Sequence, residues 1–360
     1  MRAQALRPKN GARAAVRQGA VQEKEMAHNM SRSTIQDVAA LAGVSATTVS
    51  HVINETRYVS PQTKKAVLDA VEQLSYVPDL SARNLKTRKK KMIGFIIPTL
   101  YNSYFFNIIE AVESAIRDEG YSLLISNSKE DPEKELQSFR HLSSGLVDGI
   151  IAVSSLEDFS SVAEVIPPGF PILLIDRVLK NCACDSLTVS TYDSIRDAAV
   201  HLLRSGHSRI TYLASDDKLQ TTTERLAAFQ DAVKAQGASD TRVSICFADS
   251  TANAQNTGTA YHQIRTAIEE GSTAIFASTN AMTQEALRYL CERNLSPVKD
   301  VELVGLFNPP YICSYPGMWW INMPGRALGA MAGKAMLARL ADASSPPMHK
   351  IICSQVITNL

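Results

Sequence analysis

Residues 34–54, which read TIQDVAALAGVSATTVSHVIN, constrain the fold of this chain more than any other stretch. Apolar residues recur at helical spacing in its first part, at Ile35, Val38, Ala39 and Ala42. Thr34 stands where it can cap this helix, Asp37 favours its positive N-terminal end, and Gly43 can end it in the left-handed conformation. Ser45 is then placed to cap a second helix. The stretch therefore predicts a helix-turn-helix.

The predicted second helix has two contrasting faces. Val49, Val52 and Ile53 fall on one side and form an inward stripe. The opposite side carries small and polar residues, which are Ala46, Thr47, Ser50, His51 and Asn54. Hydroxyl, imidazole and amide groups can hydrogen-bond base edges or phosphate oxygens in a major groove. A small helical hairpin with an ordinary polar surface is the alternative, but the complete string favours DNA binding.

A third helix is predicted from Pro61 to about Ser75. Ser60 followed by Pro61 is typical of an N-cap and a first helical residue. The apolar residues expected to face the first two helices are Ala66, Val67, Ala70, Val71 and Leu74. The three helices would form an all-α headpiece over residues 31–78.

Residues 34–54 resemble, nearly position for position, the DNA-binding headpiece of the lactose/galactose repressor (LacI/GalR) family, and most closely its purine-repressor branch. The resemblance implies a sequence-specific transcription regulator that binds double-stranded operator DNA through this domain. The residues that it places at the DNA are Thr34, Ser45, Ala46, Thr47, Thr48, Ser50, His51, Asn54 and Arg57.

Residues 79–91, DLSARNLKTRKKK, match the hinge helix and linker of that family. The resemblance implies that the hinge helix orders on operator DNA and pairs with its dimer mate in the minor groove. Leu85 stands at the family's leucine wedge, which would partly unstack a base step and bend the duplex. The flanking positions that contact sugar, phosphate or the groove floor are Ala82, Arg83 and Lys86. We interpret the basic run 88–91 as a solvated linker that adds nonspecific attraction to phosphate.

The formal net charge of +1 conceals an uneven distribution. Lys and Arg exceed Asp and Glu by four in residues 1–30 and by five in residues 31–91, whereas the remainder has a net charge of −8. The N-terminal part therefore suits a polyanion, and the acidic body would not wrap in one. Residues 1–30 are expected to be disordered, or to precede a natural start at Met26 or Met30. A basic arm that touches DNA is the alternative.

Several classes of protein are disfavoured by what the sequence lacks. A run of about 18 apolar residues and the apolar core of a secretory signal are both missing, so neither a membrane span nor export is expected. Walker, Gly-x-Gly-x-x-Gly, HExxH and Gly-x-Ser-x-Gly motifs are missing too, which argues against an enzyme. The cysteines have no paired zinc spacing; they are Cys182, Cys184, Cys246, Cys291, Cys313 and Cys353. A redox or metal role for Cys182-Ala-Cys184 is disfavoured, and a reduced cytoplasmic protein without cofactor or metal is expected.

From Met92 onward, short apolar runs alternate with helical patterns, which is typical of parallel sheets covered by helices. Two doubly wound halves, about 92–190 and 191–320, would leave a cleft at the carboxyl ends of their strands. The predicted strands are 92–98, 121–128, 147–154, 171–177, 209–215, 243–249, 273–279 and 301–307, and the predicted helices are 104–119, 132–144, 193–205, 223–236 and 281–294.

Several body segments, among them SGHSRITYLAS at 205–215 and ERLAAFQDA at 224–232, resemble the α/β periplasmic-binding-protein fold of the same family. The resemblance implies that the chain returns to the first half at about residues 321–340 and crosses back to the second at about residues 341–360. It also implies that residues 325–337, which read GRALGAMAGKAML, form a helix at the dimer interface. Because the C-terminal residues carry no leucine heptads, a homodimer is expected rather than a tetramer.

The resemblance also places eight residues near a small-molecule effector: Asn102, Tyr104, Phe105, Asp176, Arg225, Asn280, Phe307 and Asn308. Arg225 matches a ligand-facing arginine, with a salt bridge as the alternative, and Phe105 and Phe307 are equally compatible with the core. Phe307 replaces an Asp common in the family, which removes two acceptors and adds apolar surface. Neither a purine nor a hexose held by the usual hydroxyl contacts is therefore expected. A smaller or more apolar metabolite, or an acid held by Arg225, fits better.

Together these features predict a cytoplasmic, homodimeric transcription regulator, most simply a repressor, that binds a pseudo-palindromic operator. Effector binding in the cleft would change operator affinity by linkage, with no sign predicted. A ligand-dependent activator and a corepressor-requiring regulator are open alternatives. A solute-binding protein is a remote one, since it would need an export signal and no headpiece.

Overall fold

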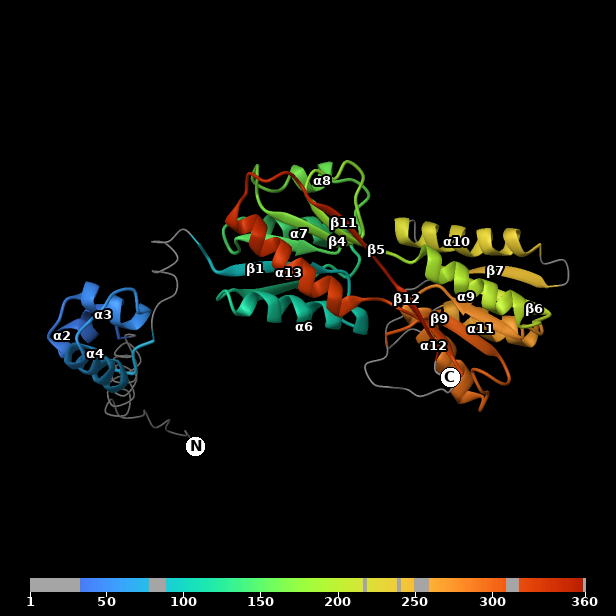
Figure 1. The fold of residues 1–360 in the computed structure, drawn as a ribbon, viewed down its shortest axis with the longest axis horizontal. Helices are drawn as coiled ribbons and strands as arrows, with labels where there is room; N and C mark the ends of the chain where they lie inside the picture. Colours follow the sequence, from blue (N-terminus) through green and yellow to red (C-terminus); the bar gives the residue numbers. More distant parts are fainter. Residues whose placement is uncertain are drawn as a thin grey trace, which may run out of the picture. The chain divides into compact units, whose positions relative to one another are not determined.

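The computed structural model describes residues 33–77, 89–215, 219–237, 241–248, 259–308 and 317–358. The chain divides into two compact units, one ending at Arg88 and the other beginning at Lys89. The first contains the helical headpiece and the second contains two sheets with their helices, the body (Figure 1). The predicted N-terminal extension and the predicted hinge residues Ala82, Arg83, Leu85 and Lys86 lie outside the described residues.

Three helices form the headpiece: α2 (Ile35–Ala42), α3 (Ala46–Asn54) and α4 (Pro61–Gln73). One valine from each helix, Val38, Val49 and Val67, is fully buried at the centre. The predicted helix-turn-helix and third helix are thus confirmed. Ala66 is a correction, because it lies on the solvent side of α4, one residue before the buried Val67.

The ends of α2 and α3 are fixed by side chains that the sequence indicated. Thr34 Oγ1 accepts a hydrogen bond from the Asp37 N–H at 3.3 Å, and the Asp37 carboxylate accepts from the Thr34 N–H at 2.7 Å, which completes a capping box. Gly43 ends α2 with a φ of 64°, which glycine adopts at little cost. Ser45 Oγ accepts from the Thr48 N–H at 3.1 Å and caps α3. These bonds satisfy backbone groups that the helix ends would leave unpaired.

The body contains two six-stranded sheets. The first has the order β11-β5-β4-β3-β1-β2 and consists of β1 (Met92–Ile97), β2 (Ser122–Asn127), β3 (Gly149–Ala152), β4 (Ile172–Asp176), β5 (Asp185–Ser190) and β11 (His349–Cys353). The second has the order β12-β10-β9-β8-β6-β7 and consists of β6 (Arg209–Ser215), β7 (Arg242–Ala248), β8 (Ala274–Ala277), β9 (Glu302–Leu306), β10 (Trp319–Asn322) and β12 (Gln355–Thr358). Among the described strands, all pairs are parallel except β10 with β12. The two predicted doubly wound halves are therefore confirmed.

Helices cover these sheets, as the buried character of the central strands requires. Every residue of β3 and β4 is buried, which is typical of parallel strands with helices on both faces. The body helices are α6 (Ser103–Arg117), α7 (Pro132–Ser143), α8 (Ser160–Ala163), α9 (Tyr192–Arg204), α10 (Gln220–Gln236), α11 (Thr259–Glu269), α12 (Asn280–Glu292) and α13 (Gly325–Ala341). The late helix α13 lies beside α6 of the first half (Figure 1).

Two segments near the C-terminal end lie in the half opposite to the predicted one. Residues 321–322 belong to β10, which pairs with β9 in the second sheet rather than returning to the first. Residues 349–353 form β11, which pairs with β5 in the first sheet. The reason is that β5 carries buried apolar residues and would otherwise expose a free hydrogen-bonding edge. Within 341–358, only β12 therefore crosses back to the second sheet.

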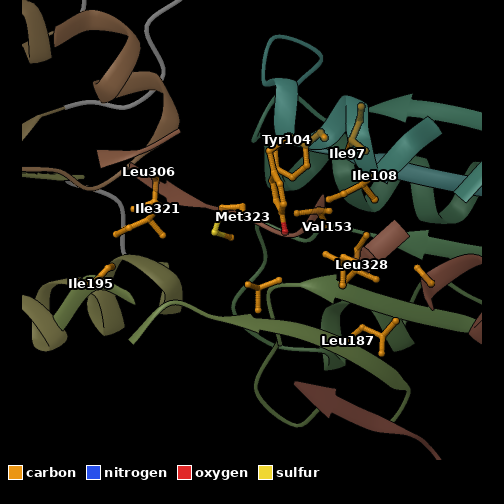
Figure 2. Close-up of a cluster of buried hydrophobic side chains, with 14 of the residues drawn as sticks. Ile97, Tyr104, Ile108, Val153, Leu187, Ile195, Leu306, Ile321, Met323 and Leu328 are labelled. Carbon is orange, nitrogen blue, oxygen red and sulfur yellow. The ribbon is translucent and has the colours of Figure 1, made fainter. Parts of the chain in front are cut away.

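The chain crosses between the two halves three times, after β5, after β10 and after β11. Ser354 joins the first and third crossovers, because its N–H donates to the Ser190 carbonyl at 3.0 Å. Met323 lies in the second crossover, donating its N–H to Asn308 Oδ1 at 3.2 Å and accepting from Asn308 Nδ2 at 2.8 Å. In Figure 2, Met323 is drawn between Ile321 of the second half and Tyr104 of the first. These hydrogen bonds thus hold the first and third crossovers to each other and the second crossover to Asn308.

Helices α6 and α13 approach unusually closely. Gly325, Gly329 and Gly333 recur every fourth residue along α13 and face α6. A β-carbon at Gly329 would lie 2.8 Å from Ala111 Cβ, and one at Gly333 would lie 2.7 Å from Ala115 Cβ. Small residues at this spacing allow two helix backbones to pack with little space between them. The residues of α13 exposed on the body include Arg326 and Lys334.

Candidate functional site

The surface of α3 gathers most of the residues predicted to meet DNA. Ser45 and Thr47 are exposed, and Thr48, Ser50, His51 and Asn54 are half-buried. Thr34, which caps α2, is exposed as well. This surface presents hydroxyl, imidazole and amide groups over about two helical turns, the chemistry that can bond base edges.

Local hydrogen bonds orient the larger side chains on α3. His51 Nδ1 lies 2.7 Å from Thr56 Oγ1, which fixes the ring and directs Nε2 away from Thr56. Asn54 donates from Nδ2 to the Ser50 carbonyl at 2.8 Å and to Ser50 Oγ at 3.3 Å. The amide oxygen of Asn54 therefore remains the acceptor through which it could bond DNA. An oriented imidazole and amide lose less rotational freedom on binding.

Two residues of the headpiece, Ala46 and Tyr58, differ from expectation. Ala46 contacts the hydrophobic core of the headpiece, so it is only partly on the predicted DNA face. Arg57 is exposed, and beside it Tyr58 has 91% of its surface exposed. Tyr58 was not among the predicted residues. The sequence feature that could have indicated Tyr58 is an aromatic residue next to an arginine in the polar loop before α4.

In the body, three predicted effector residues gather where β4 ends. The buried Tyr104 hydroxyl donates to Asp176 Oδ1 at 2.8 Å. Asp176 is the last residue of β4, and its φ of 68° lies in the left-handed region, which non-glycine residues mostly adopt at functional sites or turns. Arg225 of α10 lies near enough for electrostatic attraction to both. The cluster joins side chains from α6, β4 and α10.

Burial and charge act together on this cluster. Burial raises the pKa of Tyr104 well above its ordinary value, and the Asp176 carboxylate raises it further, so the phenol remains a neutral donor. Burial lowers the pKa of Arg225, and attraction to Asp176 opposes that shift. Arg225 Nη1 donates to the Ser278 carbonyl at 3.3 Å, while its buried Nε has no partner within the described part of the chain. A guanidinium with an unused donor is suited to an additional acceptor.

Three predicted asparagines bond one another across the two halves. Asn102 caps α6 by accepting from the Tyr104 N–H at 3.0 Å, and it also accepts from Asn280 Nδ2 at 3.0 Å. Asn280 Oδ1 accepts in turn from the Asn308 N–H at 3.4 Å. The Ser103 hydroxyl donates to the Asn308 carbonyl. These asparagines therefore connect the halves beside the Met323 crossover, in addition to any role in ligand contact.

The two phenylalanines are both buried. Phe105 belongs to the hydrophobic core of the first half and lies 5.3 Å from the Tyr104 ring, centroid to centroid. The core alternative therefore describes Phe105 better than a ligand-stacking role. Phe307 follows β9, is buried, and donates its N–H to the Ile321 carbonyl at 3.1 Å. It places a phenyl ring directly after the end of β9.

A cavity of about 1020 Å³ opens between the halves, at the carboxyl ends of β3, β4 and β5 and the start of α10. Of the eight predicted effector residues, Asp176 lines it. Lining residues that the sequence reasoning left out include Glu130, Ser155, Arg177, Ser190, Gln220 and Glu224. For part of the set the signal was position, since Ser190 ends β5, Arg177 directly follows β4, and Glu130 and Ser155 lie in the loops after β2 and β3, where ligands bind in open α/β sheets.

Arg177 is the cavity residue with the most unused hydrogen-bonding capacity. Its side chain is 13% exposed and lies 3.7 Å from Glu130 and 4.0 Å from Asp176. The buried Nε and Nη1 have no hydrogen-bond partner within the described residues. A buried polar group without a partner is costly, so a ligand acceptor at this position would be favourable.

A buried carboxylate supports the loop that follows β3. Glu135 of α7 accepts from the Ser154 hydroxyl and, at 2.8 Å, from the Ser155 N–H. Burial raises the pKa of Glu135, while the bonds from Ser154 and Ser155 oppose that shift. Glu135 therefore holds Ser154 and Ser155 at the cavity wall.

Over the residues that the structure describes, no group of His, Cys, Asp and Glu is arranged to hold a metal ion. Within the same residues, no helix has the length and apolar character needed to cross a membrane.

Two family descriptions match the chain. "Bacterial regulatory proteins, lacI family" matches residues 34–79, and "Periplasmic binding protein-like domain" matches residues 199–358. Among curated proteins, the HTH-type transcriptional repressor PurR of Actinobacillus pleuropneumoniae is 32% identical over 311 residues, covering 86% of this chain and 91% of the relative. PurR of Mannheimia succiniciproducens is 30% identical over 313 residues, covering 86% and 92%.

Solved structures show the same fold. The lac repressor dimer bound to operator and the anti-inducer ONPF has a TM-score of 0.76 at 24% identity, covering 91% of this chain and 98% of the other. The regulator CelR in complex with cellobiose has a TM-score of 0.62 at 22% identity, covering 91% and 99%. A helical headpiece followed by two parallel α/β halves is thus shared along nearly the whole length of these proteins.

Proposed function

Because the chain belongs to the lacI family of bacterial regulatory proteins, DNA-binding repressors with a periplasmic-binding-protein-like effector domain, we propose that it is a homodimeric repressor whose operator affinity is set by a ligand in the cleft. Two headpieces on a two-fold axis would read a pseudo-palindromic operator in successive major grooves. Its site of action would be the bacterial cytoplasm.

One observation carries the proposal for control by a ligand. The hydrogen bond from Asn280 to Asn102, at 3.0 Å, joins the two halves, and Asn102 caps the helix whose Tyr104 donates to the cleft residue Asp176. A molecule that fits one relative orientation of the halves better than another would shift the balance between them. The shift would pass along the chain to the headpiece, and operator affinity would change by the same coupling free energy.

The proposed DNA-reading residues are those that α3 exposes or half-exposes. Thr47 and His51 would contact bases, and Ser45 and Thr48 would contact phosphate near the N-terminal end of α3. Arg57 and Tyr58 extend this surface into the loop before α4. For Ala82, Arg83, Leu85 and Lys86 the hinge role rests on the resemblance alone.

The cleft favours a ligand that carries a carboxylate or another strong acceptor. Arg177, which lines the cleft, retains buried N–H donors without a partner among described residues; Arg225, which does not line the cleft but lies near its Asp176, retains one as well. Glu130, Gln220 and Glu224 could accept bonds from hydroxyl or amine groups elsewhere on the same molecule. We therefore propose a small polar organic acid rather than a purine or neutral sugar.

The experiment has two steps. Genomic fragments bound by the full chain are recovered and sequenced, and a recurring pseudo-palindrome is the expected result. Binding to that site is then measured with cell metabolites separated by anion exchange. The acidic fraction should change the binding of the wild type but not of Arg177→Ala, while Arg288→Ala, which removes an arginine paired with Glu285 and outside the cleft lining, should respond normally. Binding to DNA without sequence preference would overturn the proposal that the chain is a repressor of specific operators. A response confined to neutral metabolites would overturn only the proposed class of ligand.

A further inference from the structure

Two cysteines of the first half lie with their sulfur atoms almost in contact. Cys182 and Cys184 occupy the irregular segment between β4 and β5, and their Sγ atoms are 3.6 Å apart. Cys182 Sγ also lies 3.5 Å from the Cys184 carbonyl oxygen. Both residues are half-buried, and neither is among the residues that line the cleft. The sequence alone did not favour a role for this pair, because a Cys-x-Cys spacing does not fix whether the two thiols point to the same side.

The flanks of this segment are held in place on both sides. Before it, Asn181 has a φ of 55° and donates from Nδ2 to Asp158 Oδ2 at 2.6 Å. After it, the Asp185 carboxylate accepts from Arg339 of α13 at 2.8 and 2.7 Å and from the Met348 N–H at 2.7 Å. Both ends of a very short loop are therefore anchored, and the two thiols are kept together rather than meeting by chance.

The environment makes the two sulfurs chemically different. A hydrogen bond from the Cys184 thiol, with His349 nearby, lowers the pKa of Cys182 to about 6, although burial opposes this. The bond to Cys182 and burial both raise the pKa of Cys184. At neutral pH, Cys182 is therefore mostly thiolate, the nucleophilic form, and Cys184 is a thiol that donates to it.

We propose that Cys182 and Cys184 are a redox modification site that a hydroperoxide oxidises to an intramolecular disulfide. The Cys182 thiolate attacks one peroxide oxygen, the O–O bond breaks, and Cys182 becomes a sulfenic acid while hydroxide, or alkoxide from an organic peroxide, leaves. Cys184 loses its proton to that leaving group. Its sulfur then attacks the sulfenic sulfur, the S–O bond breaks, and hydroxide departs and takes up a proton as water. A dithiol reductant reverses the change by thiol–disulfide exchange.

The other described cysteines lack this combination of properties. Burial raises the pKa of Cys246, which leaves it protonated at neutral pH. Cys291 and Cys353 are exposed, and the structure gives neither of them a neighbouring thiol in bonding distance. Cys291 on α12 is therefore a suitable control for a solvent-exposed thiol without a partner.

Mass spectrometry tests the proposal directly on the full chain. The folded protein is treated with a small excess of hydrogen peroxide at neutral pH, free thiols are alkylated, and the protein is digested with trypsin. Cleavage after Lys180 and Arg196 yields one peptide that contains Cys182 and Cys184 and no other cysteine. We expect this peptide to lose the mass of two hydrogen atoms, to resist alkylation, and to regain both alkylation sites after treatment with dithiothreitol.

Variants and pH separate this mechanism from general thiol damage. Cys184→Ser should stop at the sulfenic or sulfinic acid of Cys182, Cys182→Ser should leave Cys184 reduced, and Cys291→Ser should behave as the wild type. The oxidation rate of the pair should reach half its plateau near pH 6, where Cys182 gains its thiolate. Preferential oxidation of Cys291 over the pair would overturn the proposal. A rate that rises through pH 8–9, as for an ordinary thiol, would overturn it as well.

Discussion

Replacing Gly329 with alanine tests how tightly α13 packs on α6. The new β-carbon would lie well under 3.0 Å from the Ile108 carbonyl oxygen and 2.8 Å from Ala111 Cβ. The first neighbour is backbone, so the two helices must separate because no side chain can rotate away. Overpacking of this kind costs about 3 kcal/mol, and the better helix propensity of alanine returns about 1 kcal/mol. The expected net loss in the free energy of unfolding is about 2 kcal/mol.

The other two glycines provide a graded comparison. A β-carbon at Gly333 would lie 2.7 Å from Ala115 Cβ but 3.2 Å from the nearest carbonyl oxygen, that of Val112, and one at Gly325 would lie 3.0 Å from the Tyr104 carbonyl oxygen. The destabilisation should therefore fall from Gly329→Ala through Gly333→Ala to about zero for Gly325→Ala. This order depends on the helix contact and not on glycine in general.

Calorimetric thermal unfolding of the full chain is the assay, with Lys334→Ala on the exposed side of α13 as the surface control. For a domain of this size, about 2 kcal/mol corresponds to a melting temperature lower by about 4–8 °C. Gly329→Ala should show this decrease, and Lys334→Ala should change little. Equal effects at all three glycines, or a higher melting temperature for Gly329→Ala, would refute the close helix contact.

Three further predictions concern the headpiece and the body. Thr47→Ala should change which bases are preferred among sequenced bound fragments; a uniform loss of affinity for all sequences would exclude base reading. Arg339→Ala should cost about 3 kcal/mol in denaturant unfolding at neutral pH, because it leaves the buried Asp185 carboxylate unpaired. Burial acts to raise the pKa of Asp185, but the bonds from Arg339 and the Met348 N–H outweigh it and lower that pKa. The stability that these bonds supply is complete above the ordinary carboxyl pKa and is lost as pH falls through the lowered value. The free energies of unfolding of wild type and variant should therefore converge in acid. Tyr104→Phe should remove the donor to Asp176 and lower stability by about 1–2 kcal/mol, whereas an unchanged denaturation midpoint would show that solvent replaces the bond.

Local signals predicted the elements whose ends or periodicity are strong. The caps at Thr34 and Ser45 and the buried runs that became β3 and β4 needed no tertiary information. The strand β5 was missed because its sequence, DSLTVS, is largely polar. It is a strand because β4 and β11 pair with its two edges, and β11 lies more than 150 residues away in sequence. Long-range pairing of this kind leaves no periodic signal within a short window.

The position of the cleft was predictable from the sequence, but most of the residues that line it were not. Motif resemblance indicated Asp176 and Arg225, and the structure brings both near Tyr104. Arg177 and Ser155 were missed, because a residue that follows a strand lines a cleft only if the opposite half comes close to it. For Phe105 the sequence left a core role and a ligand role equally open, since an aromatic residue at helical spacing is used by the core at least as readily as by a ligand, and the structure places it in the core.

The order of strands along the chain has a consequence for synthesis on the ribosome. The first half begins at Met92, yet it lacks α13 and the strand β11 until residues 325–353 have emerged. The second half likewise waits for β12, so both halves are completed only when residues 349–358 have been synthesised. The headpiece, whose contacts are all local, is complete some 280 residues earlier. A nascent or truncated chain would therefore carry a finished DNA-binding domain on an unfinished, aggregation-prone body, and premature termination near residue 320 should yield insoluble protein instead of a smaller regulator.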